Sequence, residues 1–355
     1  MSELSSRHGR FLCVSESTYG DDAVDAALSD GTIDLIYQDI RSGSLDPTRV
    51  QVDSPRIRST HSGTRHKTIG DHVPVTLEFP LQPLVAASAG DEAPYCSPIY
   101  KAANLEETIV SATSSAYNPS TKQQAGMTVY HYEEELESAR QRLTYTTGVR
   151  GTLSFDFQLD QEAMCTFTGT GLYQGPISND FEYFNSAGGV AKKKTGINSV
   201  TARSTGEEKY ADQSPYICEN MTITIDGTSY ALSGINVDLN WSTIQKRQIN
   251  SQNVTSKVLC VRDEGNRIGG SMSLVDGTQG IEGLISSMAV DDSEATLIIT
   301  ISNGSRTTTF NFPQIQLGQP TKGDNGGLRT YDIPWFANGD FSDLAGDNDF
   351  TMTNT

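Results

Sequence analysis

The chain has 355 residues, of which 44 are acidic and 26 basic, so its formal net charge is −18. Because phosphate binding requires Lys and Arg to displace counterions, this balance argues against a protein that grips nucleic acid, but allows one that lies near DNA. Short runs rich in Thr, Val, Ile, Phe and Tyr alternate with Gly, Asn and Asp, which is typical of an all-β protein. Since a single core usually stops growing at about 250–300 residues, two core units are expected.

The N-terminal segment, residues 1–45, is expected to form one short strand followed by a long polar arm. Residues 72–81 place alternate apolar side chains on one face, which is the period of a half-buried strand. Residues 97–110 are the best helix candidate of this half, because they open with Ser-Pro and carry apolar residues at helical spacing. Further strands are expected at 126–135, 141–147, 149–159 and 163–173.

Residues 181–217 lose this periodicity and are polar, Gly-rich and locally basic, so we interpret them as a linker. Beyond them the order of elements repeats: strand, long polar loop, strand, helix and a run of strands. This repetition predicts a first unit at 46–180 and a second unit at 218–338. The Asp-rich end, residues 339–355, is expected to be an extended arm that orders only against a partner.

Within the second unit, Asp226-Gly227 predicts the turn of a hairpin. Residues 242–256 are interpreted as a polar loop and residues 280–290 as a helix. The expected strands of this unit are 257–261, 267–276, 294–302, 307–317 and 328–337.

The sequence offers no convincing catalytic, cofactor or metal site. His61, His66 and His72 lie in or beside one loop, with a spacing that fits no standard zinc site. Residues 169–175, "GTGLYQG", lack the Gly-Lys-Ser/Thr end of a phosphate loop and are better read as the end of a strand. Neither a GxSxG motif nor a His placed beside a nucleophile is found, so we predict a protein that is not an enzyme.

The five cysteines are widely spaced and include no CxxC pair, which predicts neither a zinc ribbon nor a disulfide framework. We expect reduced and mostly buried thiols in a protein that is assembled in a cytoplasm. The sequence contains no targeting segment and no apolar run of about 18 residues, so no membrane segment is predicted.

Four segments carry a resemblance to a known family. Residues 16–28, "ESTYGDDAVDAAL", follow a short strand, and "RLTYTTGVRGTLSFDFQLDQEAMCTFTGTGLY" at 142–173 forms a central block. "YALSGINVDLN" at 230–240 and "FNFPQIQLGQPTKGDNGGLRTYDIPWFA" at 310–337 follow in order. In their order and spacing these segments resemble the tail tube proteins, or major tail proteins, of long, non-contractile-tailed bacteriophages (siphoviruses).

The resemblance implies a mainly β fold of two tandem tail-tube-type β-sandwich or barrel domains, each with one short flanking helix. It implies rings whose inner strands close into one β-barrel and which stack into a hollow tube for genomic DNA. The implied partners are further copies of the chain, the tail terminator and tail tip proteins, and the tape measure protein and DNA that pass through the lumen. The implied location is the virion tail, after assembly in the bacterial cytoplasm.

The repeat favours trimeric rings with pseudo-sixfold symmetry; hexamers whose second half decorates the outside are the alternative. Segments 143–158, 229–240 and 295–317 are the candidates for the inner wall. Loop 60–72 and the corresponding loop 242–256 are the candidates for reaching a neighbouring subunit or ring.

Two other functions remain open at this point. A carbohydrate-binding or host-binding β-sandwich would favour an exposed aromatic cluster, for which Tyr130, Tyr132 and Tyr145 are candidates. A tail terminator or tip protein of the same fold would form one ring and stop.

Overall fold

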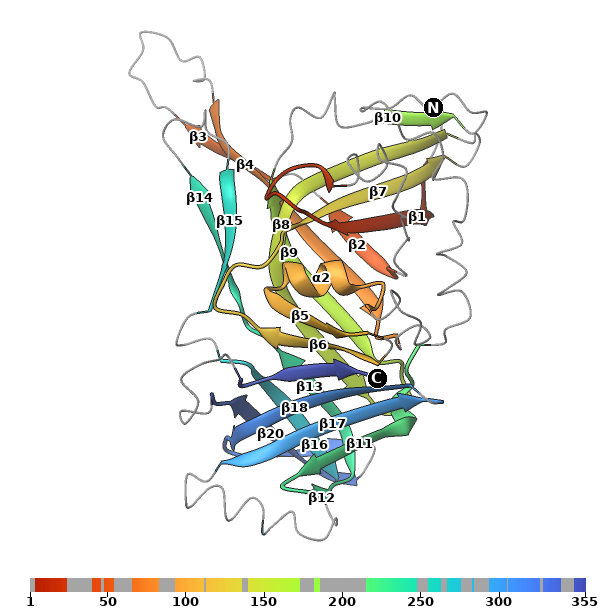
Figure 1. Cartoon of the computed structure of the whole chain (residues 1–355), viewed down its shortest axis with the longest axis vertical. Coiled ribbons are helices and arrows are strands. Elements are labelled where there is room, and N and C mark those ends of the chain that lie inside the picture. The colour runs from red at the N-terminus through yellow and green to blue at the C-terminus, as the bar shows by residue number, and fades with distance from the viewer. Residues whose placement is uncertain are drawn as a thin grey trace.

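A computed structural model of the chain is dominated by antiparallel β-structure (Figure 1). It describes residues 4–23, 40–45, 48–53, 66–82, 93–111, 113–135, 140–172, 182–185, 215–247, 255–262, 267–275, 283, 294–304, 306–325, 328–339 and 348–355. The expectation of a mainly β fold is therefore confirmed.

The elements are named in chain order. The helical ones are α2 (Ser97–Ala102) and the 3₁₀ turn η1 (Cys218–Asn220). The strands are β1 (Leu4–Ser15), β2 (Ser42–Leu45), β3 (Thr48–Asp53), β4 (His66–Pro80), β5 (Leu105–Val110), β6 (Ser114–Pro119), β7 (Met127–Glu135), β8 (Arg140–Gln158), β9 (Met164–Leu172), β10 (Glu182–Asn185), β11 (Met221–Ile225), β12 (Thr228–Ser229), β13 (Leu232–Asp238), β14 (Ser242–Arg247), β15 (Thr255–Val261), β16 (Gly269–Val275), β17 (Ala295–Asn303), β18 (Arg306–Leu317), β19 (Thr321–Asn325), β20 (Leu328–Ala337) and β21 (Thr351–Asn354).

A continuous antiparallel sheet, here called the central sheet, runs through both halves of the chain in the order β2–β4–β9–β8–β13–β16–β20–β19. Its strands alternate buried and more exposed residues, as Val75, Leu77 and Phe79 do against Thr76 and Glu78 on β4. This is the pattern of a sheet with one face on the core and one face open.

A second layer covers the apolar face of the central sheet and consists of β12–β11–β17–β18–β21–β6–β5, with α2 beside it. Aromatic rings join the two layers: Phe310 meets Phe155 and Phe157 edge-on at centroid distances of 5.1 and 5.4 Å. Phe312 packs in the same way on Trp335 at 4.9 Å. The core thus extends across both halves of the chain.

Strand β8 changes neighbours along its length. Its first half pairs with β7, which also pairs with β1, whereas its second half lies between β9 and β13. The change occurs near Gly148, whose φ of +62° is one that Gly adopts without strain. One strand therefore belongs to two sheets and links the N-terminal segment to the central sheet.

Two local expectations have different outcomes. The turn at Asp226-Gly227 is confirmed, since both residues have positive φ values (+48° and +73°) and join β11 to β12. The helix expected over 97–110 is wrong beyond Ala102, because Asn104 takes a φ of +60° and ends it. The β-branched residues that follow continue as β5 instead.

The described end of the chain differs from the expected extended arm. Strand β21 pairs with β18 on one side and with β6 on the other, and Phe350 and Met352 are fully buried. This segment is therefore part of the core of its own chain. The helix expected at 280–290 lies outside the described residues except for Gly283, and so does most of the linker 181–217.

Both segments expected to be projecting loops are built, as far as they are described, of paired strands. Residues 242–247 and 255–261 form the two-stranded ribbon β14–β15, here called the arm, and residues 66–72 of β4 pair with β3. Figure 1 shows the two ribbons projecting from the same side of the molecule, and β15 contacts β4. Residues 60–65 and 248–254 lie outside the described part.

Candidate functional site

The first candidate site is the open face of the central sheet, which is polar. Basic residues on its strands, such as Arg150 of β8, Lys322 of β19 and Arg329 of β20, lie outside the middle stretches of the sheet. The more exposed residues of the open face carry hydroxyl, amide or carboxylate groups; they include Thr76, Glu78, Ser154, Asp156, Thr166, Thr168, Asn236, Asp238, Ser271, Ser273 and Asp332. None of the described strand residues 72–80, 152–158, 164–172, 232–238, 269–275 and 330–337 is Lys or Arg. Such a face cannot attract phosphate groups by charge.

Carboxylates lie at the centre of this face, where β8 meets β13. Asn236 is opposite Asp156 in the register, and Asp238 is opposite the adjacent Ser154. Burial, and then the nearby carboxylate of Asp156, raises the pKa of Asp238. The sheet therefore holds two acidic groups close together at the seam between the halves of the chain.

The second candidate site is the junction between the body and the arm, and it begins with Glu16. This side chain is 5% exposed, and its carboxylate accepts hydrogen bonds from the backbone N–H of Gly148 (2.5 Å) and of Gly20 (2.7 Å). It also accepts one from the Thr128 hydroxyl at 3.1 Å. Burial raises the pKa of Glu16, and these hydrogen bonds and Arg150 oppose that effect.

Tyr19 extends this network to the arm. Its hydroxyl donates to the carbonyl of Gly148 (2.8 Å) and accepts from the N–H of Val258 on β15 (2.6 Å). Burial raises the pKa of Tyr19 to about 12, so the phenol stays protonated and can make both bonds. The Arg150 guanidinium lies 4.4 Å from the centre of its ring.

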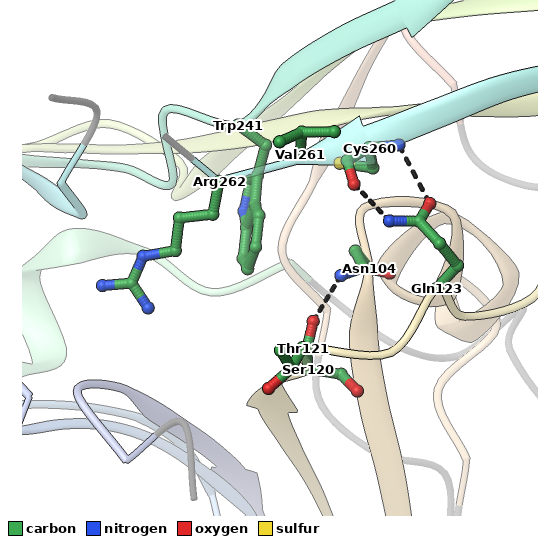
Figure 2. Close-up of a pocket in the computed structure, with 8 residues that line it drawn as sticks. All are labelled: Asn104, Ser120, Thr121, Gln123, Trp241, Cys260, Val261 and Arg262. Carbon is green, nitrogen blue, oxygen red and sulfur yellow. Dashed lines mark hydrogen bonds between the residues drawn. The ribbon is translucent and has the colours of Figure 1, made fainter. Parts of the chain in front are cut away.

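A cavity of about 430 Å³ lies beside this junction (Figure 2). The amide of Gln123 donates to the carbonyl of Cys260 and accepts from its N–H at 2.9 Å. Trp241 is 6% exposed, and its indole N–H finds no acceptor among the described residues, whereas Arg262 pairs with Asp349. The lining residues are Asn104, Ser120, Thr121, Gln123, Trp241, Cys260, Val261 and Arg262.

The chemistry of the junction is that of binding and positioning. Burial raises the pKa of the Cys260 thiol to about 12, so it is not a thiolate nucleophile near neutral pH. Within the part of the chain that the structure describes, no three His, Cys, Asp or Glu side chains are grouped so that they could hold a metal ion. All five cysteines are buried in the structure, and their burial agrees with the expectation from the sequence.

The sequence candidates for other functions are not brought together. Of the three histidines, His61 and the side chain of His66 lie outside the description, and His72 is half-buried on β4. Tyr130 and Tyr145 pack on each other at 5.2 Å and are only 2% and 7% exposed, so they do not form an exposed aromatic platform.

Sequence reasoning missed Gln123, Arg150 and Trp241. The partners of the first two are remote: Gln123 and Cys260 are 137 positions apart, and Arg150 and Val258 are 108 apart. Glu16, Tyr19 and Gly20 stood out only as a pattern, without a role. The sole available signal was a charged or aromatic residue in an otherwise irregular segment.

No protein-family model matches the chain, and no curated protein is similar to it. Among the described helices, none combines the length and the hydropathy that crossing a bilayer requires.

Proposed function

We propose that the chain is the structural subunit of a phage tail tube: its copies form rings that stack into a hollow conduit for genomic DNA. One observation carries the proposal. The seam between β8 and β13 joins two sets of strands of the same order. The strands at the two ends of the sheet, β2 and β19, are the counterparts of β13 and β8, the two strands that pair at the seam.

The two strand sets correspond in their pairing. The first set is β2–β4–β9–β8 and the second is β13–β16–β20–β19. Each set begins with a strand that leads into a projecting ribbon, β3–β4 in the first and the arm in the second. Each set ends with a hairpin, β8–β9 in the first and β19–β20 in the second. This correspondence supports two tandem units in one chain.

Within the chain, the last strand of the first set pairs with the first strand of the second. Among the described strands, β2 pairs only with β4 and β19 pairs only with β20. A second copy can therefore place its β2 beside β19 and continue the sheet as β13 does beside β8. Head-to-tail contacts of this kind close into rings, and closure removes the exposed sheet edges.

This arrangement favours a trimeric ring. If each chain supplies two units, three chains supply six and give pseudo-sixfold symmetry. Hexameric rings with an outer second half are the alternative, but the second set continues the sheet of the first rather than lying outside it.

The polar face suits the lumen of such a tube. DNA carries about one charge per 1.7 Å of helix axis, so a wall that carried Lys and Arg would retain it. The open face of the central sheet offers hydroxyls and carboxylates instead. With this face turned inward, DNA and the tape measure protein would pass without sequence-specific binding.

The two ribbons suit contacts along the tube. Both project from one side of the molecule, where a stacked ring would lie (Figure 1). The same surfaces would meet the tail terminator and tip proteins at the ends of the tube in the virion. A terminator or tip ring of the same fold is the second candidate. A carbohydrate-binding module is less well supported, because Tyr130 and Tyr145 are buried.

Negative-stain electron microscopy of the concentrated protein combined with cysteine cross-linking tests the proposal. Ser44→Cys on β2 and Thr321→Cys on β19 place exposed thiols on the two free edge strands. The native thiols are all buried, so a short thiol-specific cross-linker should act on the new pair. Hollow tubes that yield covalent dimers and trimers, and no larger species, are expected.

The control replaces Thr321→Cys with Thr228→Cys, which is exposed on β12 at another edge, and it should give no multimers. Covalent hexamers would favour the alternative ring. Isolated rings would favour a terminator or tip protein. Small particles that persist at all concentrations and never cross-link would contradict the assembly.

A further inference from the structure

The arm meets the body through an edge strand whose backbone groups are satisfied by side chains. In an antiparallel pair, only alternate residues direct their N–H and C=O groups toward the partner strand. On β15, the N–H and C=O groups of Val258 and Cys260 are directed away from β14 and toward the body. Both residues are buried, so these groups need partners.

The body supplies these partners from three segments that are distant in the sequence. The Tyr19 hydroxyl accepts from the N–H of Val258 (2.6 Å), and an Arg150 nitrogen donates to its carbonyl (3.0 Å). The Gln123 amide makes both bonds to Cys260. Four backbone groups are therefore paired as they would be by a neighbouring strand, although no strand is there among the described residues.

Two of the three side chains, Arg150 and Tyr19, are themselves held by hydrogen bonds to the body. Arg150 is 5% exposed, and its second terminal nitrogen donates to the carbonyl of Gln124 at 2.6 Å. Tyr19 is held by its bond to Gly148, whose N–H binds Glu16. Lys257 of the arm also lies over the Tyr19 ring, 5.5 Å from its centre. Because these donors and acceptors are held in place, they can fix the direction of β15 as well as its contact with the body.

We propose that Tyr19, Gln123 and Arg150 are positioning residues that replace a missing strand beside β15 and fix the direction in which the arm leaves the body. These three residues thereby control how the arm meets a neighbouring copy. This last clause rests on the proposed function, whereas the anchoring itself does not.

Hydrogen exchange of the unassembled protein tests the anchoring. In Tyr19→Phe the aromatic ring remains but the acceptor for Val258 N–H is lost, and in Gln123→Ala both bonds to Cys260 are lost. We expect the amide of Val258 in the first variant, and that of Cys260 in the second, to exchange about five- to tenfold faster.

Tyr95→Phe is the matched control, because its hydroxyl donates to the carbonyl of Pro80 within the body. It should leave exchange in residues 255–262 unchanged. Unchanged exchange at Val258 and Cys260 in Tyr19→Phe and Gln123→Ala would overturn the proposal, whatever the assembly does.

Tube formation by the same variants tests whether the anchoring controls how the arm meets a neighbouring copy. Fewer or shorter tubes from Tyr19→Phe and Gln123→Ala than from Tyr95→Phe would support it. Faster exchange together with normal tubes would overturn it while leaving the anchoring in place. A wild-type protein that forms no tubes would contradict the proposed function, and the exchange result would still decide the anchoring.

Discussion

The second half of the chain meets the first at several places, β21 beside β6 among them, and two of these seams are built differently. The β8–β13 seam is a backbone ladder that pairs residues 154–158 with residues 234–238. The seam at β15 instead uses the side chains of Tyr19, Gln123 and Arg150. A backbone ladder accepts almost any side chain except Pro, whereas a side-chain seam depends on the identity of each anchor.

The two seams also differ in the core behind them. The β8–β13 seam lies over buried aromatic rings, so it should open only when the whole molecule unfolds. Ile244 of the arm is 48% exposed, whereas Val258 and Cys260 at its base are buried. The outer part of the arm should therefore open locally while the base stays closed. One seam therefore maintains the fold, while the other can set the direction of the arm. Four measurements test this difference.

The largest effect is expected from the core behind the backbone seam. Phe310 is fully buried between the layers, so Phe310→Ala should lower the free energy of unfolding by about 3–5 kcal/mol. Phe336, at 43% exposure on β20, is the matched control, and Phe336→Ala should cost less than about 1 kcal/mol. Urea denaturation measures both. Equal losses would mean that the aromatic core does not support this seam.

A smaller effect is expected at the root of the side-chain seam. Glu16→Ala removes the acceptor for two backbone N–H groups in a buried site and should cost about 2–3 kcal/mol. Glu219→Ala, at an exposed position, should be neutral within about 0.5 kcal/mol. If denaturation gave the same small loss for both, Glu16 would not organise the junction.

Local patterns predicted the parts of the fold that depend on neighbouring residues. The alternation on β4 predicted Val73, Val75, Leu77 and Phe79 as its buried side, and all four are at most 2% exposed. Asp226-Gly227 predicted its turn because two positive φ values are needed there. Each of these patterns depends only on residues a few positions apart, so it can be recognised without knowledge of the tertiary structure.

Local sequence patterns do not predict the structure where a partner from far along the chain decides it. Residues 242–247 did not read as a strand, because an arm that projects from the body buries little and shows little apolar alternation. Asn104 ends its helix with a side chain bonded to the carbonyl of Ser120. The junction was not predicted as a site, because Glu16 and Tyr19 acquire their roles only beside Gly148 and Val258.

Two glutamines at the two seams give a direct comparison. Gln123→Ala removes two hydrogen bonds from β15 and should cost about 1–2 kcal/mol. Gln158→Ala alters the backbone seam, where the described side-chain bond is one to Asp156, and should cost less than about 0.5 kcal/mol. Chemical denaturation of both variants measures the difference. A larger loss from Gln158→Ala would reverse the distinction between the two seams.

The smallest effect concerns charge at the backbone seam. Burial, and then Asp156, raises the folded-state pKa of Asp238 above its ordinary value of 3.8. The folded state therefore holds the proton more tightly than the unfolded state does, and stability from this group is lost as pH rises between the ordinary and the raised pKa. Asp238→Asn cannot ionise, so it should avoid this loss.

We expect Asp238→Asn to be more stable than the wild type at neutral pH by a few tenths of a kcal/mol, and by at most about 1 kcal/mol because the site is half-exposed. The advantage should vanish below about pH 3, where the wild-type carboxyl is protonated in both states. Urea midpoints at neutral and acidic pH measure it. An advantage of equal size at both pH values would mean that the amide gains a hydrogen bond, and that the two carboxylates impose no cost on the seam.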